Sequence, residues 1–388
     1  MPKQSISGHR RPKIGGTLAS RLAALVAMTL QPGAATAQHQ LKMSGSVALT
    51  QSYDDNVFAV PDDRRQDAIS RLTPRLGVSY RSRHFDVRAR YAREAEAFSQ
   101  NRELSTLRAR QEGTLDVQWF PWAGFEAAGG ASYVETYSPG EFTVITGLDL
   151  VGLQLRRQLA RRFSTTGSLS RRLGARSRAV VTHGFTRDEF VGAVRSASQA
   201  ATGRLDRLVG PVDTLSLAYG LRRFTAAGDG STSHALTLGW ARDVTPQTHL
   251  ELKAGPRLSG GKVDPELGAT LRHRFQRGEA ALSYVQTETA LIGRPTPVTA
   301  EGLSATFTRS LSRTLTVTGG PSVFRARGKA LEATVYGTSL DLAWHLNRHL
   351  SLAGSHQLSI QYGELDGRPR GEIVHNIVVL RLVAGSVN

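Results

Sequence analysis

The sequence predicts an all-β protein: one transmembrane antiparallel β-barrel of about 18 strands, preceded by a signal peptide. Two patterns support this prediction. Apolar and polar side chains alternate along many segments of about 10 residues, the length that a tilted strand needs to cross a bilayer. The connections between these segments are alternately short and long, which is typical of outer-membrane barrels. No apolar run reaches the roughly 20 residues of a membrane-spanning helix.

Residues 1–37 have the features of a signal peptide. A basic start without acidic residues precedes an apolar run at 22–30, and Ala35-Thr36-Ala37 supplies the small residues that signal peptidase accepts. That run, about 9 residues, is too short for a membrane anchor. We therefore expect a leader over 1–37 and a single barrel domain over 38–388, located in the outer membrane of a Gram-negative bacterium.

The composition excludes several kinds of chemistry. The chain of 388 residues contains no cysteine, so disulfides, thiolate catalysis and cysteine metal sites are absent. Its formal net charge is +17, and a basic chain often binds nucleic acid, a membrane surface or an acidic substrate. An exported chain does not meet nucleic acid, and its arginines are spread singly along the alternating segments. We expect no nucleic-acid partner and no cofactor.

The expected strand over 71–81 shows the alternation. One face carries Leu72, Pro74, Leu76, Val78 and Tyr80, and the other carries Arg71, Thr73, Arg75, Gly77, Ser79 and Arg81. Short turns are expected at 82–84, 120–124, 244–247, 275–278, 311–313 and 345–349. Long loops are expected at 54–67, 137–146, 175–187, 226–231, 292–299 and 362–371. The last strand is expected over about 372–382.

The strand count has one weak point. Alternation fades between residues 185 and 212, where we place one strand to keep the number even; the alternative is 16 strands. A soluble β-sandwich is the competing fold. Its inner faces would have to be apolar, whereas the polar faces here are rich in arginine. Aromatic residues also gather near expected strand ends, as interfacial girdles require, among them Tyr91, Trp119, Trp122, Tyr133 and Trp344.

No catalytic motif is evident. The chain has no Gly-x-Ser-x-Gly, and its histidines are scattered; His345 and His349 lack the glutamate of a zinc-protease motif. Asp54-Asp55-Asn56 and Asp62-Asp63 lack the spacing of an EF-hand, so we interpret them as turn residues rather than a calcium site. We expect a protein that is not an enzyme and holds no metal.

A basic inner wall is the predicted functional feature. In a closed barrel alternate residues face lipid and lumen, so the apolar face of each strand fixes which charged residues point inward. The expected lumen-facing basic residues are Arg71, Arg75, Arg81, Arg88, Arg90, Arg108, Arg110, Lys253, Arg257, Arg272 and Arg274. Two interpretations stay open and are compatible: arginine–carboxylate pairs that brace the wall, or a positive potential that draws anions into a pore.

The start of the mature chain resembles a family of outer-membrane β-barrel porins often associated with exopolysaccharide gene clusters. The resemblance rests on Tyr53-Asp54-Asp55-Asn56-Val57-Phe58 at the end of a first strand and Thr73-Pro74-Arg75-Leu76 in the next. Thr245-Pro246-Gln247-Thr248 is similar to the family's periplasmic turns. The resemblance implies passage of a secreted polysaccharide through the barrel, fed by periplasmic export proteins.

We therefore expect a porin-like conduit for export of an acidic exopolysaccharide through a basic lumen, with outer-membrane lipid, an anionic polysaccharide and periplasmic export proteins as partners. One alternative is a structural or surface-binding barrel with a closed lumen, which predicts paired lumen charges. A less favoured alternative is an outer-membrane hydrolase. An inward-folded plug has no signature in the sequence.

Overall fold

The computed structural model describes residues 39–142, 148–191, 195–226, 229–292, 294, 296–329, 331–365 and 368–385. The expected signal peptide, residues 1–37, lies outside the described residues. In the described part of the chain, no helix is long and apolar enough to span a membrane.

The described chain consists of 18 strands and two short 3-10 helices. In order these are β1 (His39–Asp54), β2 (Asp67–Ser82), β3 (Phe85–Phe98), η1 (Arg102–Leu104), β4 (Thr106–Trp119), β5 (Phe125–Thr136), η2 (Pro139–Phe142), β6 (Ala160–Arg172), β7 (Ser177–Phe190), β8 (Arg195–Leu208), β9 (Asp213–Ala226), β10 (Asp229–Thr245), β11 (Thr248–Ser259), β12 (Lys262–Phe275), β13 (Gly278–Thr289), β14 (Val298–Ser310), β15 (Leu315–Gly328), β16 (Leu331–Asn347), β17 (Leu350–Leu365) and β18 (Arg368–Gly385).

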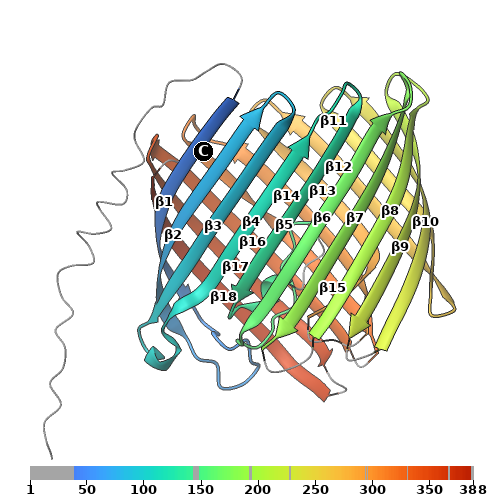
Figure 1. The fold of residues 1–388 in the computed structure, drawn as a ribbon. Coiled ribbons are helices and arrows are strands. Elements are labelled where there is room, and N and C mark those ends of the chain that lie inside the picture. The colour runs from blue at the N-terminus through green and yellow to red at the C-terminus, as the bar shows by residue number, and fades with distance from the viewer. Residues whose placement is uncertain are drawn as a thin grey trace, which may run out of the picture.

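The strands form one closed antiparallel barrel. Each strand pairs with the next along the chain, and β1 also pairs with β18, with Ser46 opposite Gly385. The tilted strands run around the whole wall in Figure 1. Closure leaves no unpaired sheet edge, as a bilayer requires. The prediction of 18 strands is confirmed, and the strand placed between residues 185 and 212 is β8.

The connections differ partly from those expected. One end of the barrel, the turn end, carries both described chain termini and the short connections that follow even-numbered strands; the other is the loop end. The loop expected at 175–187 is wrong, because β7 occupies most of it. The loops expected at 226–231 and 362–371 are also largely strand. The longer loop-end connections are 55–66, 99–105, 137–159 and 290–297.

The outer wall is apolar and bounded by aromatic residues. Leucines such as Leu238, 67% exposed in the isolated chain, face outward along the strands. At the turn end Phe85 stacks on Trp119 with ring centroids 6.1 Å apart. Near the loop end tyrosine hydroxyls reach polar side chains; Tyr53 donates to Gln66 and Tyr133 to Glu135. Both girdles are typical of a barrel that sits in a bilayer.

Candidate functional site

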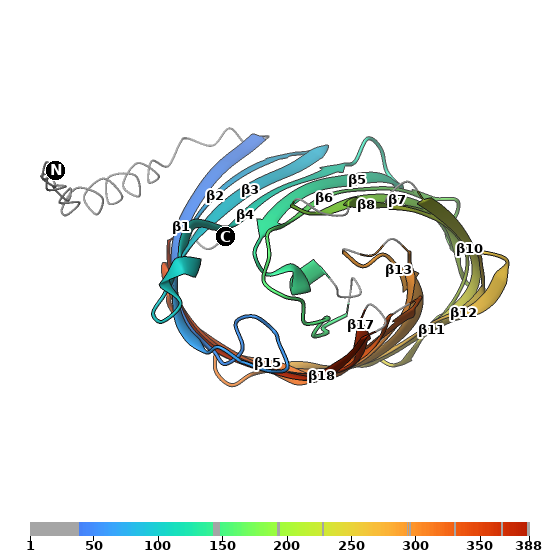
Figure 2. The ribbon, with the colours of Figure 1, turned by 90° about the horizontal axis from the view of Figure 1, so that it is seen from below.

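The connection between β5 and β6 folds into the lumen. Figure 2, viewed along the barrel from the loop end, shows η2 and residues 148–159 inside the ring of strands. The expected loop ended at residue 146, but the connection continues to 159, and its described residues 148–159 contact the inner wall. We call residues 137–159 the inward segment. Side chains that contact it face the lumen, as do those that alternate with them along each strand.

An apolar cluster fixes one side of the inward segment. Leu153 is 2% exposed and packs with Phe324 of β15, Val335 of β16 and Leu291 of the β13–β14 connection. Burial of one such leucine contributes about 1.5–3 kcal/mol. A backbone hydrogen bond holds the segment on the same wall. The backbone N–H of Gln154 donates to the side-chain Oε1 of Gln361 on β17 at 2.7 Å. The apolar core of this protein therefore lies inside the barrel, at the loop end.

Arginine contacts fix the opposite side. Arg157 donates to Glu96 of β3 at 2.6 Å, and the two side chains are only 9% and 4% exposed. Its guanidinium also lies 4.9 Å from the ring centroid of Phe98 and 5.3 Å from that of Tyr137. Glu141 at η2 pairs with Arg110 of β4. The segment is thus attached to β3 and β4 on one side and to β14–β18 on the other, and it narrows the lumen.

A histidine connects the inward segment to the loop end of β1. His375 of β18 contacts Gln154 Oε1 through Nδ1 and Asp54 Oδ1 through Nε2, each at 2.8 Å. The Asn56 amide nitrogen binds the carbonyl of Val60. The Asp54-Asp55-Asn56 run therefore acts in turn and loop contacts, as interpreted. Among the described residues, no three His, Asp or Glu side chains lie together as a metal site.

Most of the basic residues expected in the lumen make ion pairs with carboxylates. Arg71 pairs with Glu96 and Glu94, Arg81 and Arg88 with Asp86, Arg90 with Asp116, Arg110 with Glu112 and Glu141, Arg257 with Asp264 and Glu266, and Arg272 and Arg274 with Glu279. Arg257 is fully buried, and Arg222 of β9 shares its partner Glu266 at 2.6 Å. Most of these pairs join neighbouring strands, whereas Arg88–Asp86 and Arg110–Glu112 lie within one strand and Arg222–Glu266 joins β9 to β12.

Three of the expected residues have no such partner. Arg75, Arg108 and Lys253 make no ion pair among the described residues. The stem of Lys253 lies against Gly268. The pairing of β3 with β4 is irregular between Glu94 and Glu96, so alternation does not carry through to Arg108. Regular pairing places Arg75 opposite Ser46 of β1 and Ala92 of β3, and Lys253 opposite Gly239 of β10 and Gly268 of β12.

Sequence reasoning missed another arginine of the lumen that has no ion pair among the described residues. Arg381 of β18 alternates with the outward Leu380 and Leu382 and forms no ion pair among the described residues; its Nε is buried without a hydrogen-bond partner. The signal was present in the sequence, because Leu380 and Leu382 alternate with Arg381 within the expected last strand. Arg381 and Arg75 line the same two lumenal cavities, of about 460 and 830 Å³.

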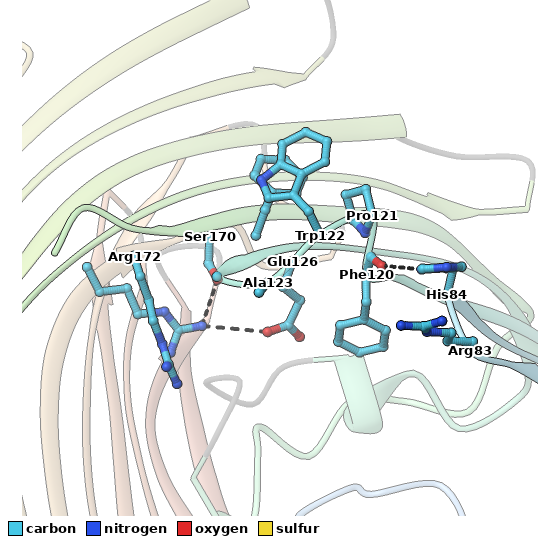
Figure 3. Close-up of a pocket in the computed structure, with 12 residues that line it drawn as sticks. Arg83, His84, Phe120, Pro121, Trp122, Ala123, Glu126, Ser170 and Arg172 are labelled. Carbon is cyan, nitrogen blue, oxygen red and sulfur yellow. Dashed lines mark hydrogen bonds and ion pairs between the residues drawn. The ribbon is translucent and has the colours of Figure 1, made fainter. Parts of the chain in front are cut away.

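A third pocket, of about 580 Å³, lies at the turn end (Figure 3). Phe120, Pro121 and Trp122 form one side of it, and His84 Nδ1 contacts the Phe120 carbonyl oxygen at 2.9 Å. Arg83, Arg172 and Arg178 line it with a single carboxylate, Glu126, which lies 3.8 Å from Arg178. Positive charge is therefore in excess in this pocket.

The sequence matches no family model and no curated protein. Solved structures that resemble the barrel include OccAB4 of Acinetobacter baumannii, with a TM-score of 0.46 and 10% identity over 89% of this chain and 98% of that chain. They also include the anion-selective porin of Comamonas acidovorans, at 0.41 and 12% over 90% and 100%. A mutant of the ferric enterobactin receptor PfeA of Pseudomonas aeruginosa aligns at 0.44 and 11% over 88% and 80%. Similarity at this level carries no argument about what the present chain binds.

The barrel wall itself identifies the compartment. A closed antiparallel barrel satisfies every strand hydrogen bond without water, and its outer face is apolar between two aromatic girdles. The lumen, in contrast, is lined by arginines and carboxylates. The chain is an integral β-barrel protein of the outer membrane of a Gram-negative bacterium.

Proposed function

We propose that this barrel is a porin-like channel for anionic solutes, narrowed by the inward segment. The observation that carries the proposal is the distribution of free charge along the lumen. Arg75 and Arg381 line the central cavities without ion-pair partners among the described residues, and the turn-end pocket is lined by three arginines and one carboxylate. Low-dielectric walls focus such a field and raise the local concentration of anions.

The solute we propose is an acidic saccharide, with a secreted exopolysaccharide as its polymeric form. Support for the polymer comes from the resemblance of residues 53–58 and 73–76 to porins of exopolysaccharide gene clusters. Periplasmic export proteins would then deliver the chain at the turn end. Serine hydroxyls and separated arginines along the lumen suit a polysaccharide that slides through the barrel, because each contact with it is weak.

A closed structural barrel is the second candidate. The ion pairs along the wall and the attached inward segment favour it, since both would also stabilise a barrel that conducts nothing. The two candidates differ in one measurable property, the flow of ions through the lumen.

Conductance in planar bilayers tests the proposal. Protein purified from outer membranes in detergent is inserted, and selectivity is read from reversal potentials across a salt gradient. Discrete steps with a preference for chloride over potassium support the anion channel. Folded, heat-modifiable protein without conductance would refute it and leave the closed barrel. Passage of a uronate disaccharide compared with a long uronate polymer then separates small solute from polymer.

A further inference from the structure

Arg75 and Arg381 stand out from the other arginines of the lumen. The wall around them is built of pairs: Arg90 binds Asp116 at 3.4 Å and Arg110 binds Glu112 at 3.0 Å. Arg75 and Arg381 bind neither carboxylate nor hydroxyl among the described residues. A buried guanidinium N–H without an acceptor is costly, and Arg381 Nε is in that state.

The two guanidinium groups line the same cavity. Arg75 of β2 and Arg381 of β18 flank β1, which pairs with both strands; Arg75 lies opposite Ser46, and Arg381 lies opposite Thr50. Both side chains line the cavity of about 830 Å³, and they repel each other electrostatically. Glu94 also acts electrostatically on Arg381, but it is shared with Arg71 and forms no ion pair with Arg381 or Arg75 among the described residues. Two like charges in one cavity are stabilised by an anion that enters between them.

The surrounding groups indicate which anion fits. The carboxylates that line this cavity, Glu112 and Asp116, are already paired with Arg110 and Arg90. Asp341 lines only the smaller cavity on the side of the inward segment. The hydroxyls of Ser44, Ser46 and Ser351 line the larger cavity. Guanidinium groups bind a carboxylate through charge-assisted hydrogen bonds, and serine hydroxyls can bind sugar hydroxyls.

We propose that Arg75 and Arg381 form a lumenal subsite for the carboxylate of an acidic sugar, with Ser44, Ser46 and Ser351 facing its hydroxyl groups. The inference deepens the proposed function by naming the place where the permeating solute pauses. The volume of the cavity, about 830 Å³, holds a monosaccharide with its water.

Calorimetric titration tests the subsite independently of conduction. Glucuronate is titrated into the full-length barrel in detergent, with glucose and inorganic phosphate as comparison ligands. We expect glucuronate to bind more tightly than either. The double variant Arg75→Gln/Arg381→Gln should weaken glucuronate at least about tenfold, because charged hydrogen bonds are lost. The control Arg88→Gln/Arg272→Gln removes the same charge from ion-paired arginines and should stay within about twofold.

The outcomes separate the subsite from the channel. An equal loss in both double variants would assign binding to general lumen charge and overturn the subsite. Phosphate binding as tight as glucuronate would overturn the assignment to acidic sugars. In bilayers, an anion-selective current that does not saturate with glucuronate also contradicts the subsite but leaves the channel. Saturable binding by calorimetry with no current refutes the channel and keeps the subsite. Heat modifiability confirms folding of each variant.

Discussion

Removal of the Arg157 side chain should release the inward segment from β3. Arg157 makes a 2.6 Å ion pair with Glu96, and both side chains are nearly buried. Breaking a buried pair costs about 3–5 kcal/mol. After the substitution Glu96 still pairs with Arg71 at 2.8 Å and is not left as an unpaired buried charge. The lower end of that range therefore applies. Loss of the contacts with the rings of Phe98 and Tyr137 adds about 0.5–2 kcal/mol.

The smallest sum, about 3.5 kcal/mol, corresponds to a shift of about 300-fold between attached and released segment. We therefore expect Arg157→Ala to raise mean single-channel conductance and to add rapid fluctuations as the segment moves. Conductance in planar bilayers measures both. The shift applies whether or not the unmodified barrel conducts.

The matched control is Arg161→Ala. Arg161 also makes a 2.6 Å ion pair, with Glu135, but it alternates with Arg162, whose guanidinium contacts Phe142 inside the barrel. Arg161 thus lies on the outer face, and its loss should leave conductance unchanged. If Arg157→Ala behaves like this control while it stays folded and heat-modifiable, Arg157 does not hold the segment.

Three further predictions concern stability, measured by urea unfolding in lipid vesicles with tryptophan fluorescence. Glu266→Gln should destabilise the barrel by about 3–5 kcal/mol, since it removes the charge that pairs with Arg222 and leaves the fully buried Arg257 only its 3.6 Å contact with the more exposed Asp264; an unchanged midpoint would show that these pairs are dispensable. Leu153→Ala should cost about 2–5 kcal/mol through a cavity under the inward segment, unless that segment unfolds separately. Leu238→Arg should cost about 2–4 kcal/mol, whereas Thr237→Arg, on the lumen side, should cost clearly less; equal costs would invert the assigned faces.

The alternation of apolar and polar side chains predicts the barrel, because every second residue of a strand must face lipid. Wherever an outward face is made of large apolar residues, as in β2, the strand and its faces follow from the sequence. The expectation of a loop at 175–187 failed because β7 places Ala179 and His183 outward beside Val181. Its place is determined by pairing with β6 and β8, an interaction between segments that local pattern does not contain.

The inward segment shows a different limit. Leu148, Leu150, Val151, Leu153 and Leu155 are an unusual number of apolar residues for a connection, and such residues must be buried somewhere. Local sequence does not say whether they form a strand, cover another molecule or enter the lumen. The answer depends on Phe324 and its neighbours on β14–β16, which are far away in the chain.

Bracing and conduction do not compete for the same arginines. A closed wall can hold many charges only if each is paired or hydrated, and pairing removes most of their field at a distance. The ion-paired arginines therefore contribute rigidity and little selectivity. Selectivity depends on the charges left over, among them Arg75 and Arg381 at the central cavity and Lys253 on β11. Neutralising a paired arginine such as Arg88 should thus weaken the wall, whereas neutralising Arg75 should change which ions pass.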